Sequence, residues 1–349
     1  MSTSQSNLER RVLIPGRTWG LIIAAAVLYG LIAMRSDTFL KPYTIFTISR
    51  QVEQFVLIAL AQAVCLVVGG MNLSVGGIGS VTTVALGLCA DTWHMPMWQA
   101  VLVAIAVGLA CGLLNGLLIV KLKIDSFIVT ISTMFIFMGL RSGISRGSPY
   151  AVPDSFTIIG QGGLGWNLTA DGSKIIPYVF LIMLVVLAAV IYMYRSTVFG
   201  RRMLATGGNE DAARLSGIRT DRMILGANVL SGFFAALAAV LYASELGSAA
   251  PETGDAWLLI SFAVAIIGGT GLTGGVISGV GILMGGIIYT LIGHGLVEIG
   301  APSYYMKVFF GLLILLTIAI DRGREIYGQR KRQTPETSAE PVEPAEPTQ

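Results

Sequence analysis

Long apolar runs recur along the whole sequence, and short polar joins separate them. A helix must supply about 20 mostly apolar residues to cross the hydrocarbon core of a bilayer, where it satisfies its own backbone hydrogen bonds. Only 12% of the 349 residues are charged, against roughly 25% in a soluble domain. The runs lie near 19–34, 55–68, 75–90, 97–120, 124–140, 175–194, 223–243, 257–267, 276–292 and 304–320. We therefore expect an all-α fold, a polytopic membrane helical bundle with about ten transmembrane helices (range about eight to eleven).

The distribution of Lys and Arg predicts how the chain is oriented, because loops rich in these residues stay on the cytoplasmic side. With the N-terminus inside, most of the 23 Lys and Arg residues fall on the inner side, so we expect both termini in the cytoplasm. The predicted division is a cytoplasmic segment at 1–17, a transmembrane domain at 18–322 with a cytoplasmic loop at 195–222, and a disordered cytoplasmic tail at 323–349, rich in Pro and Glu.

Residues that would support catalysis or metal binding are scarce. The three cysteines, Cys65, Cys89 and Cys111, lie in apolar runs without CxxC spacing, and His94 and His294 have no neighbouring ligand cluster. The chain also lacks the GxxxxGK[ST] loop that cradles nucleotide phosphates. We therefore expect no metal, no bound cofactor, no nucleic-acid partner and no enzymatic activity of its own.

Ionisable residues are expected to avoid the middles of the spans. An ionisable residue in the middle of a span usually marks a proton or ion pathway, because a charge near the bilayer centre is costly. The sequence therefore disfavours a proton-coupled carrier and favours a neutral polar solute. The residues assigned to span ends or outward loops are Glu53, Asp91, Arg141, Glu245, Asp255 and Glu298.

Close helix crossings are predicted where small residues recur four apart, because they let two backbones approach. Such pairs occur at Gly112/Gly116 and at Gly281/Gly285. Asn115, beside the first pair, is expected to form a hydrogen bond to a neighbouring helix.

The inner loop at 195–222 is too polar to span and predicts two short helical pieces parted by Gly207 and Gly208. Asn209 suits an N-cap, Glu210 suits the first turn near the positive end of the helix dipole, and Gly217 suits a left-handed C-terminal position. A small-residue face then comprises Ala212, Ala213, Leu215 and Ser216. From the residues alone, this segment is either a docking surface or a solvated loop.

Two glycine-rich stretches, GGMNLSVG (Gly69–Gly76) and GGTGLTGG (Gly268–Gly275), resemble each other. Aligning Gly69 with Gly268 matches five identical residues and suggests an internal repeat. These stretches either line a hydrated path or pack helices closely, with their hydroxyls bonded to neighbours. The candidate translocation-path residues are Gly69, Gly70, Asn72, Ser74, Thr270, Thr273 and Gly274.

The inner loop and the two glycine-rich stretches, in their order along the chain and with the spacing between them, closely resemble the permeases of sugar-type ABC importers, the family of ribose, xylose and arabinose permeases. In the inner loop, the residues that match this family are Phe-Gly-Arg, Gly-Gly-Asn-Glu, Ala-Ala and Ser-Gly-Ile within 199–218. The likeness covers about residues 18–322. Two positions depart from it: Met71-Asn72 stands where the family usually has Ile-Asp, and Gly293-His294-Gly295 where Asn-Asn-Gly is common.

The resemblance implies a permease subunit of the bacterial inner membrane that translocates a neutral sugar or sugar-like solute. Its expected partners are an ABC ATPase subunit that binds ATP and Mg, a periplasmic sugar-binding protein, and a second, identical or related, permease subunit. The outward loops at 142–173 and 247–255 are candidates to meet the binding protein, with Arg141 and Arg146 as possible ion-pair donors. An ion-gradient-driven carrier or a passive channel for small polar solutes is the alternative. The residues implied to couple to the ATPase are Gly207, Gly208, Asn209, Glu210, Ala212, Ala213, Ser216 and Gly217.

Overall fold

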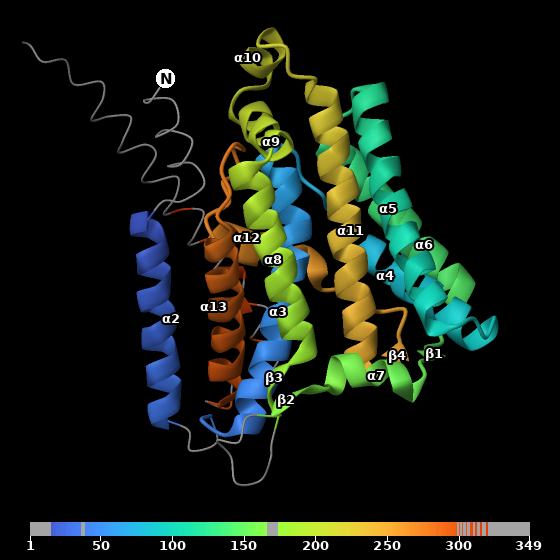
Figure 1. Ribbon diagram of the computed structural model, residues 1–349, viewed down its shortest axis with the longest axis vertical. Helices are drawn as coiled ribbons and strands as arrows, with labels where there is room; N and C mark the ends of the chain where they lie inside the picture. Colours follow the sequence, from blue (N-terminus) through green and yellow to red (C-terminus); the bar gives the residue numbers. More distant parts are fainter. Residues whose placement is uncertain are drawn as a thin grey trace, which may run out of the picture.

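The computed structural model describes residues 15–35, 39–165 and 174–298, together with single positions between 300 and 319. The expectations for residues 1–14, for most of the apolar run at 304–320 and for the tail at 323–349 lie outside these residues. The described chain forms a bundle of long helices that run mostly side by side (Figure 1).

Seven described helices are long and apolar enough to cross a membrane. Two further apolar helices are α2 (Pro15–Arg35) and the short α12 (Trp257–Ile267). The polytopic helical class is thus confirmed, and helices occupy nine of the ten apolar runs. The seven are α3 (Pro42–Val67), α4 (Val75–Gly87) with the π-helical turn η1 (Leu88–Thr92) that continues it, α5 (Met97–Leu122), α6 (Ser126–Ser145), α8 (Tyr178–Ser196), α11 (Thr220–Leu246) and α13 (Gly279–Glu298).

Shorter elements mark the two ends of the bundle (Figure 1). At one end lie α9 (Val198–Gly208) and α10 (Glu210–Leu215). At the other end α7 (Asp154–Gln161) lies across the bundle with two small antiparallel sheets. These sheets, which the all-α expectation did not include, pair β1 (Tyr150–Ala151) with β4 (Ser248–Ala249), and β2 (Gly163–Gly165) with β3 (Lys174–Pro177).

Helix α3 lies at the centre of the bundle, where every residue from Val56 to Val67 is buried. A helix that is apolar on all sides is stable only when neighbours surround it. Helices α8, α11, α12 and α13 supply those neighbours, while α5, α6 and α2 lie toward the periphery.

The predicted close crossings are present. A Cβ added at Gly112 of α5 would overlap the carbonyl oxygen of Asn228 in α11. One added at Gly285 of α13 would lie 2.6 Å from the carbonyl oxygen of Val264 in α12. Asn115 donates from Nδ2 to Ser74 Oγ at 2.7 Å, so its predicted hydrogen bond reaches the N-cap of α4 rather than a residue within a helix. Small residues therefore set the spacing of these helix pairs.

Candidate coupling junction and translocation site

The segment α9–α10 has the capping geometry that its sequence predicts. The N-cap Asn209 accepts a hydrogen bond at Oδ1 from the backbone N–H of Ala212 at 2.9 Å. Glu210 and Arg214, one turn apart, form an ion pair at 2.8 Å. Gly217 has φ +80° and ends the helix in the left-handed conformation that glycine adopts without strain. The two short helices are thus well-formed elements that project from the bundle.

Leu215 is a residue of this segment whose importance the sequence reasoning missed. Its side chain is 91% exposed at the end of α10, whereas Ala213 on the opposite face is buried against the protein. The side chain of Leu215 is therefore accessible to a partner protein at this end of the bundle. The sequence carries no local signal for this exposure, since Ala212 and Ile218 lie one turn to either side.

Beneath α10, the end of α9 packs directly on the end of α3 and on the loop between α12 and α13. The backbone N–H of Gly275, in the loop after α12, donates to the carbonyl of Val67 at 2.9 Å. A Cβ at Gly207 would overlap that same carbonyl, and one at Gly274 would lie 2.6 Å from the carbonyl oxygen of Gly207. We call this backbone-to-backbone contact the glycine junction; its members are Val67, Gly207, Gly208, Gly274 and Gly275.

The glycine junction brings together motifs that the sequence treated as separate. Gly207 and Gly208 were expected to couple to a partner, and Gly274 to line a path. In the structure they are in contact, so a displacement of α9 acts directly on the end of α3 and on the loop between α12 and α13. No side chain lies between these backbones to absorb the movement.

The two glycine-rich stretches end their helices in the same way. After α3, Gly69 has φ +84° and the N–H of Gly70 bonds to the carbonyl of Cys65; after α12, Gly269 has φ +88° and the N–H of Thr270 bonds to the carbonyl of Ala265. The structural equivalence therefore pairs Gly69 with Gly269, one residue away from the alignment made on sequence identity. The two stretches are therefore aligned correctly by their left-handed glycines, Gly69 and Gly269, rather than by the number of identical residues.

Asn72 and Ser74 lie in a buried hydrogen-bond network. Asn72 donates from Nδ2 to Ser231 Oγ at 2.8 Å and accepts at Oδ1 from Ser74 Oγ at 2.6 Å. Asn115 completes the network from α5, and all four side chains are fully buried. An amide donates and accepts at once, which an ionised carboxylate does not. This network anchors the non-helical segment 68–74 to α5 and α11.

The remaining path candidates lie on the α9 side of the bundle. Gly69 and Thr273 are exposed, Gly70 is half-buried and Gly274 is buried. Thr270 is 2% exposed, and its hydroxyl has no hydrogen-bond partner among the described residues. The structure thus divides the candidates into a group of mixed exposure on the α9 side and the buried Asn72 network.

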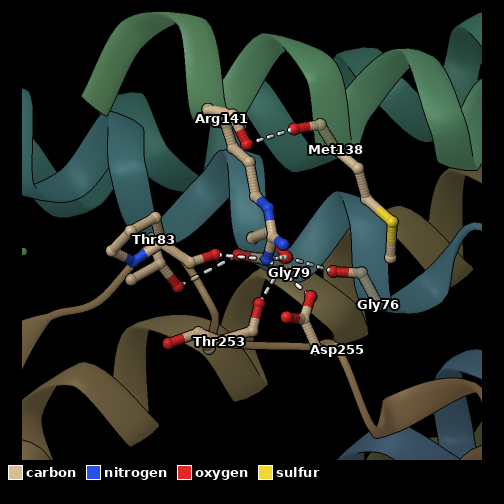
Figure 2. Close-up of polar contacts among 10 residues, drawn as sticks. Gly76, Gly79, Thr83, Met138, Arg141, Thr253 and Asp255 are labelled. Atoms are coloured by element: carbon tan, nitrogen blue, oxygen red, sulfur yellow. Dashed lines mark hydrogen bonds and ion pairs between the residues drawn. The ribbon is translucent and has the colours of Figure 1, made fainter. Parts of the chain in front are cut away.

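A second polar cluster lies where α4, α6 and the segment before α12 meet, and Figure 2 shows Arg141 reaching from α6 toward Asp255. The guanidinium of Arg141 contacts Asp255 Oδ1 at 2.6 Å, Ser80 Oγ at 3.1 Å and the carbonyl of Pro251 at 2.5 Å. Ser80 also bonds to the carbonyls of Gly76 and Thr253. Arg141 therefore has partners inside the chain, whereas Arg146 is exposed at the end of α6.

This cluster lies closer to the middle of the bundle than an outward-loop position of Asp255 predicts. Gly77 of α4 lies beside Met134, near the middle of α6, and the neighbouring Gly76 touches the backbone of Gly254. From there α12 has 11 residues, and so rises only about 16 Å. That is roughly half of a hydrocarbon core about 30 Å thick. Helix α12 is therefore a half-span helix by length, and it begins level with the middle of α6.

The expectation that Glu53 lies near a span end was wrong. Helix α3 begins at Pro42 rather than near 55, which places Glu53 well inside it with 1% exposure. One turn before it, Arg50 forms an ion pair with Glu245 of α11 at 3.1 Å. On the α13 side of α3, His294 and Gln51 are joined by a hydrogen bond of 3.1 Å.

No group of three or more His, Cys, Asp or Glu side chains in the described part of the chain is arranged to hold a metal ion. Cys65, Cys89 and Cys111 are free and buried. The geometry is that of a packed membrane bundle with a projecting inner segment and a polar mid-span cluster.

Comparisons with known proteins identify relatives along nearly the whole chain. A family model described as "branched-chain amino acid transport system / permease component" matches residues 44–318. The galactose/methyl galactoside import permease of Escherichia coli (strain K12) is 32% identical over 317 residues, which cover 86% of this chain and 93% of the relative. The ribose import permease of Bacillus subtilis (strain 168) is 32% identical over 327 residues, covering 92% and 99%. No solved structure matches. The chain therefore belongs to this family of permease components, which are multi-pass membrane proteins of transport systems.

Proposed function

We propose that this chain is the membrane-spanning permease subunit of an ATP-binding-cassette importer and that its cargo is a neutral sugar or sugar-like solute. Two relatives that match this chain over more than 90% of their own length are import permeases for galactose and ribose. The chain itself carries no phosphate-binding loop. Energy is therefore supplied by a partner ATPase that binds ATP and Mg, while this chain provides the conduit.

The glycine junction is the observation that carries the coupling part of this proposal. In it α9 meets the end of α3 and the loop between α12 and α13 without intervening side chains. We place α9 and α10 on the cytoplasmic side with both chain termini, in a topology of about ten spans. Closure of the ATPase pair would press on α10, and α9 would pass that displacement to the end of α3 and to the loop between α12 and α13.

At the opposite end of the bundle, α7 and the two small sheets form the surface for the periplasmic binding protein. A second permease subunit, identical or related, completes the transporter. Binding-protein delivery explains why the chain needs few polar groups of its own to select the sugar.

The proposal is tested by uptake into proteoliposomes that hold this chain with its ATPase and binding protein. We expect uptake of radiolabelled galactose or ribose that requires ATP and stops when the catalytic glutamate of the ATPase is replaced. Leucine is the necessary competitor, because the family description names branched-chain amino acids. Leucine uptake without sugar uptake would overturn the cargo assignment and leave the transporter class intact.

One observation favours an ion-coupled carrier, namely the buried carboxylate of Glu53 within α3. Buried ionisable residues inside spans often belong to proton pathways. In a carrier, an ionophore that collapses the proton gradient would stop uptake while ATP is still present. In the importer proposed here, uptake continues under that treatment and ends only when ATP is removed.

A further inference from the structure

The segment 250–256 is non-helical although it reaches mid-membrane depth. It leaves β4 at one end of the bundle and meets Gly76 near the middle of α6, where α12 begins. Irregular backbone at this depth is tolerated only where it is buried in protein or lines a water-filled cavity. Pro251, Thr253 and Gly254 are buried, which satisfies the first condition for one side of the segment.

The other side of the segment is exposed and carries a charge. The side chain of Asp255 is 49% exposed, and Ala256 beside it is exposed as well. Its Oδ1 faces Arg141, and no hydrogen bond of Oδ2 is found among the described residues. A half-exposed carboxylate facing lipid at this depth would be strongly unfavourable. Asp255 must therefore face water or polar groups.

The same cluster holds buried polar atoms that lack partners. Arg141 Nε and Thr253 Oγ1 are both buried without a hydrogen bond in the described part of the chain. Buried polar groups are nearly always satisfied, so such atoms indicate a water or a ligand hydroxyl. Together with Asp255 they offer both donors and acceptors, which is the chemistry that a sugar hydroxyl requires.

We propose that Asp255 lines the translocation path and accepts hydrogen bonds from the hydroxyls of the passing sugar. Arg141 is a positioning residue that holds the carboxylate in place from α6. The half-span helix α12 and the loop that follows it then link the two ends of the mechanism, because together they run from Asp255 to the glycine junction. This inference rests on the proposed function, since it names a residue that contacts the cargo.

Accessibility to water is tested first, because that measurement does not depend on transport. The three native cysteines are buried, so a charged thiol reagent reports on an introduced cysteine. Ala256→Cys leaves Asp255 intact and should react, in the purified complex in membranes, with nucleotide absent or with ATP trapped. Val185→Cys is the control, because Val185 is 70% exposed near the middle of α8 and should face lipid. An Ala256→Cys that stays unmodified in both states overturns the proposal.

The role in transport is tested with Asp255→Asn in the full complex. We expect galactose or ribose uptake per inserted transporter to fall about tenfold, as for the loss of one hydrogen bond to a charged group. ATP hydrolysis stimulated by the binding protein should persist. The matched control is Glu298→Gln, an exposed carboxylate at the end of α13, which should transport at the wild-type rate.

The remaining outcomes separate the two levels of the argument. Wild-type uptake by Asp255→Asn, in a complex whose uptake requires ATP, overturns the role of Asp255 and leaves the importer in place. A loss of membrane insertion and ATP hydrolysis in step with uptake shows a purely structural role, which also overturns it. A wild-type complex that never shows ATP-dependent sugar uptake contradicts the proposed function instead.

Discussion

Replacing Gly207 with alanine tests whether the glycine junction is as tight as the structure shows. In an open helical position, alanine is more stable than glycine by up to about 1 kcal/mol. At Gly207, however, the new methyl group would overlap the carbonyl of Val67 and lie 2.7 Å from the nitrogen of Gly275. Overpacking of this kind costs about 1–3 kcal/mol. Separation of the two backbones would also weaken the Gly275–Val67 hydrogen bond, worth about 1 kcal/mol.

Gly139 provides the matched control for this substitution. It lies inside α6, and an added Cβ there meets nothing within 4 Å. We expect Gly139→Ala to be neutral or stabilising, and Gly207→Ala to be less stable than Gly139→Ala by about 2–4 kcal/mol. The sign of the effect thus reverses between two helical glycines.

The assay measures thermal unfolding of the purified transporter and sugar uptake per ATP hydrolysed. Gly207→Ala should unfold at a lower temperature and transport less sugar for each ATP, because the displaced α9 no longer presses on the end of α3 and on the loop between α12 and α13. If Gly207→Ala matches Gly139→Ala in both measurements, the backbones are not in tight contact and the reasoning fails.

Three further substitutions probe local geometry. Gly217→Val should destabilise the end of α10 by about 1–2 kcal/mol, because φ is +80° there; we expect faster proteolysis of α10 and lower uptake, and unchanged proteolysis would contradict the strain. Asn72→Ala should leave Ser231 and Ser74 without their shared partner and lower thermal stability by about 1–3 kcal/mol; wild-type stability would show that the network is unimportant. Arg50→Leu leaves Glu245 buried without its ion-pair partner, at a cost of about 3–5 kcal/mol; the double variant with Glu245→Leu should recover much of that loss, and no recovery would contradict the pairing.

Local rules of the sequence predicted the inner segment well. The cap at Asn209 and the left-handed Gly217 depend only on residues a few positions away, so their chemistry is legible without a fold. Close packing at Gly112 was predictable for the same reason, because small residues at a spacing of four allow it wherever a neighbour exists.

Features that depend on distant contacts were not predictable. Val67, Gly207 and Gly275 meet although they lie far apart in the sequence, and nothing local shows that these backbones touch. The depth of Asp255 required knowledge that α12 spans only half of the membrane.

The start of α3 was misjudged for a physical reason. Residues 42–54 are too polar to look like part of a span, yet Ser49 and Thr47 bond to carbonyls one turn earlier in their own helix. Their hydroxyls are thereby satisfied without water, and the helix continues outward past Glu53. The apparent absence of charge from the spans followed from this early boundary error.

The central claim is that α10 receives force from a nucleotide-hydrolysing partner, and a photo-crosslinking amino acid in place of Leu215 tests it most directly. Leu215 is 91% exposed at the end of α10. Trp93, which directly follows η1 and is 60% exposed, is the control position. We predict that the probe at 215, but not at 93, cross-links the ATPase subunit in membranes, with a yield that changes when ATP is trapped. Equal or absent cross-linking to the ATPase from the two positions would contradict the account.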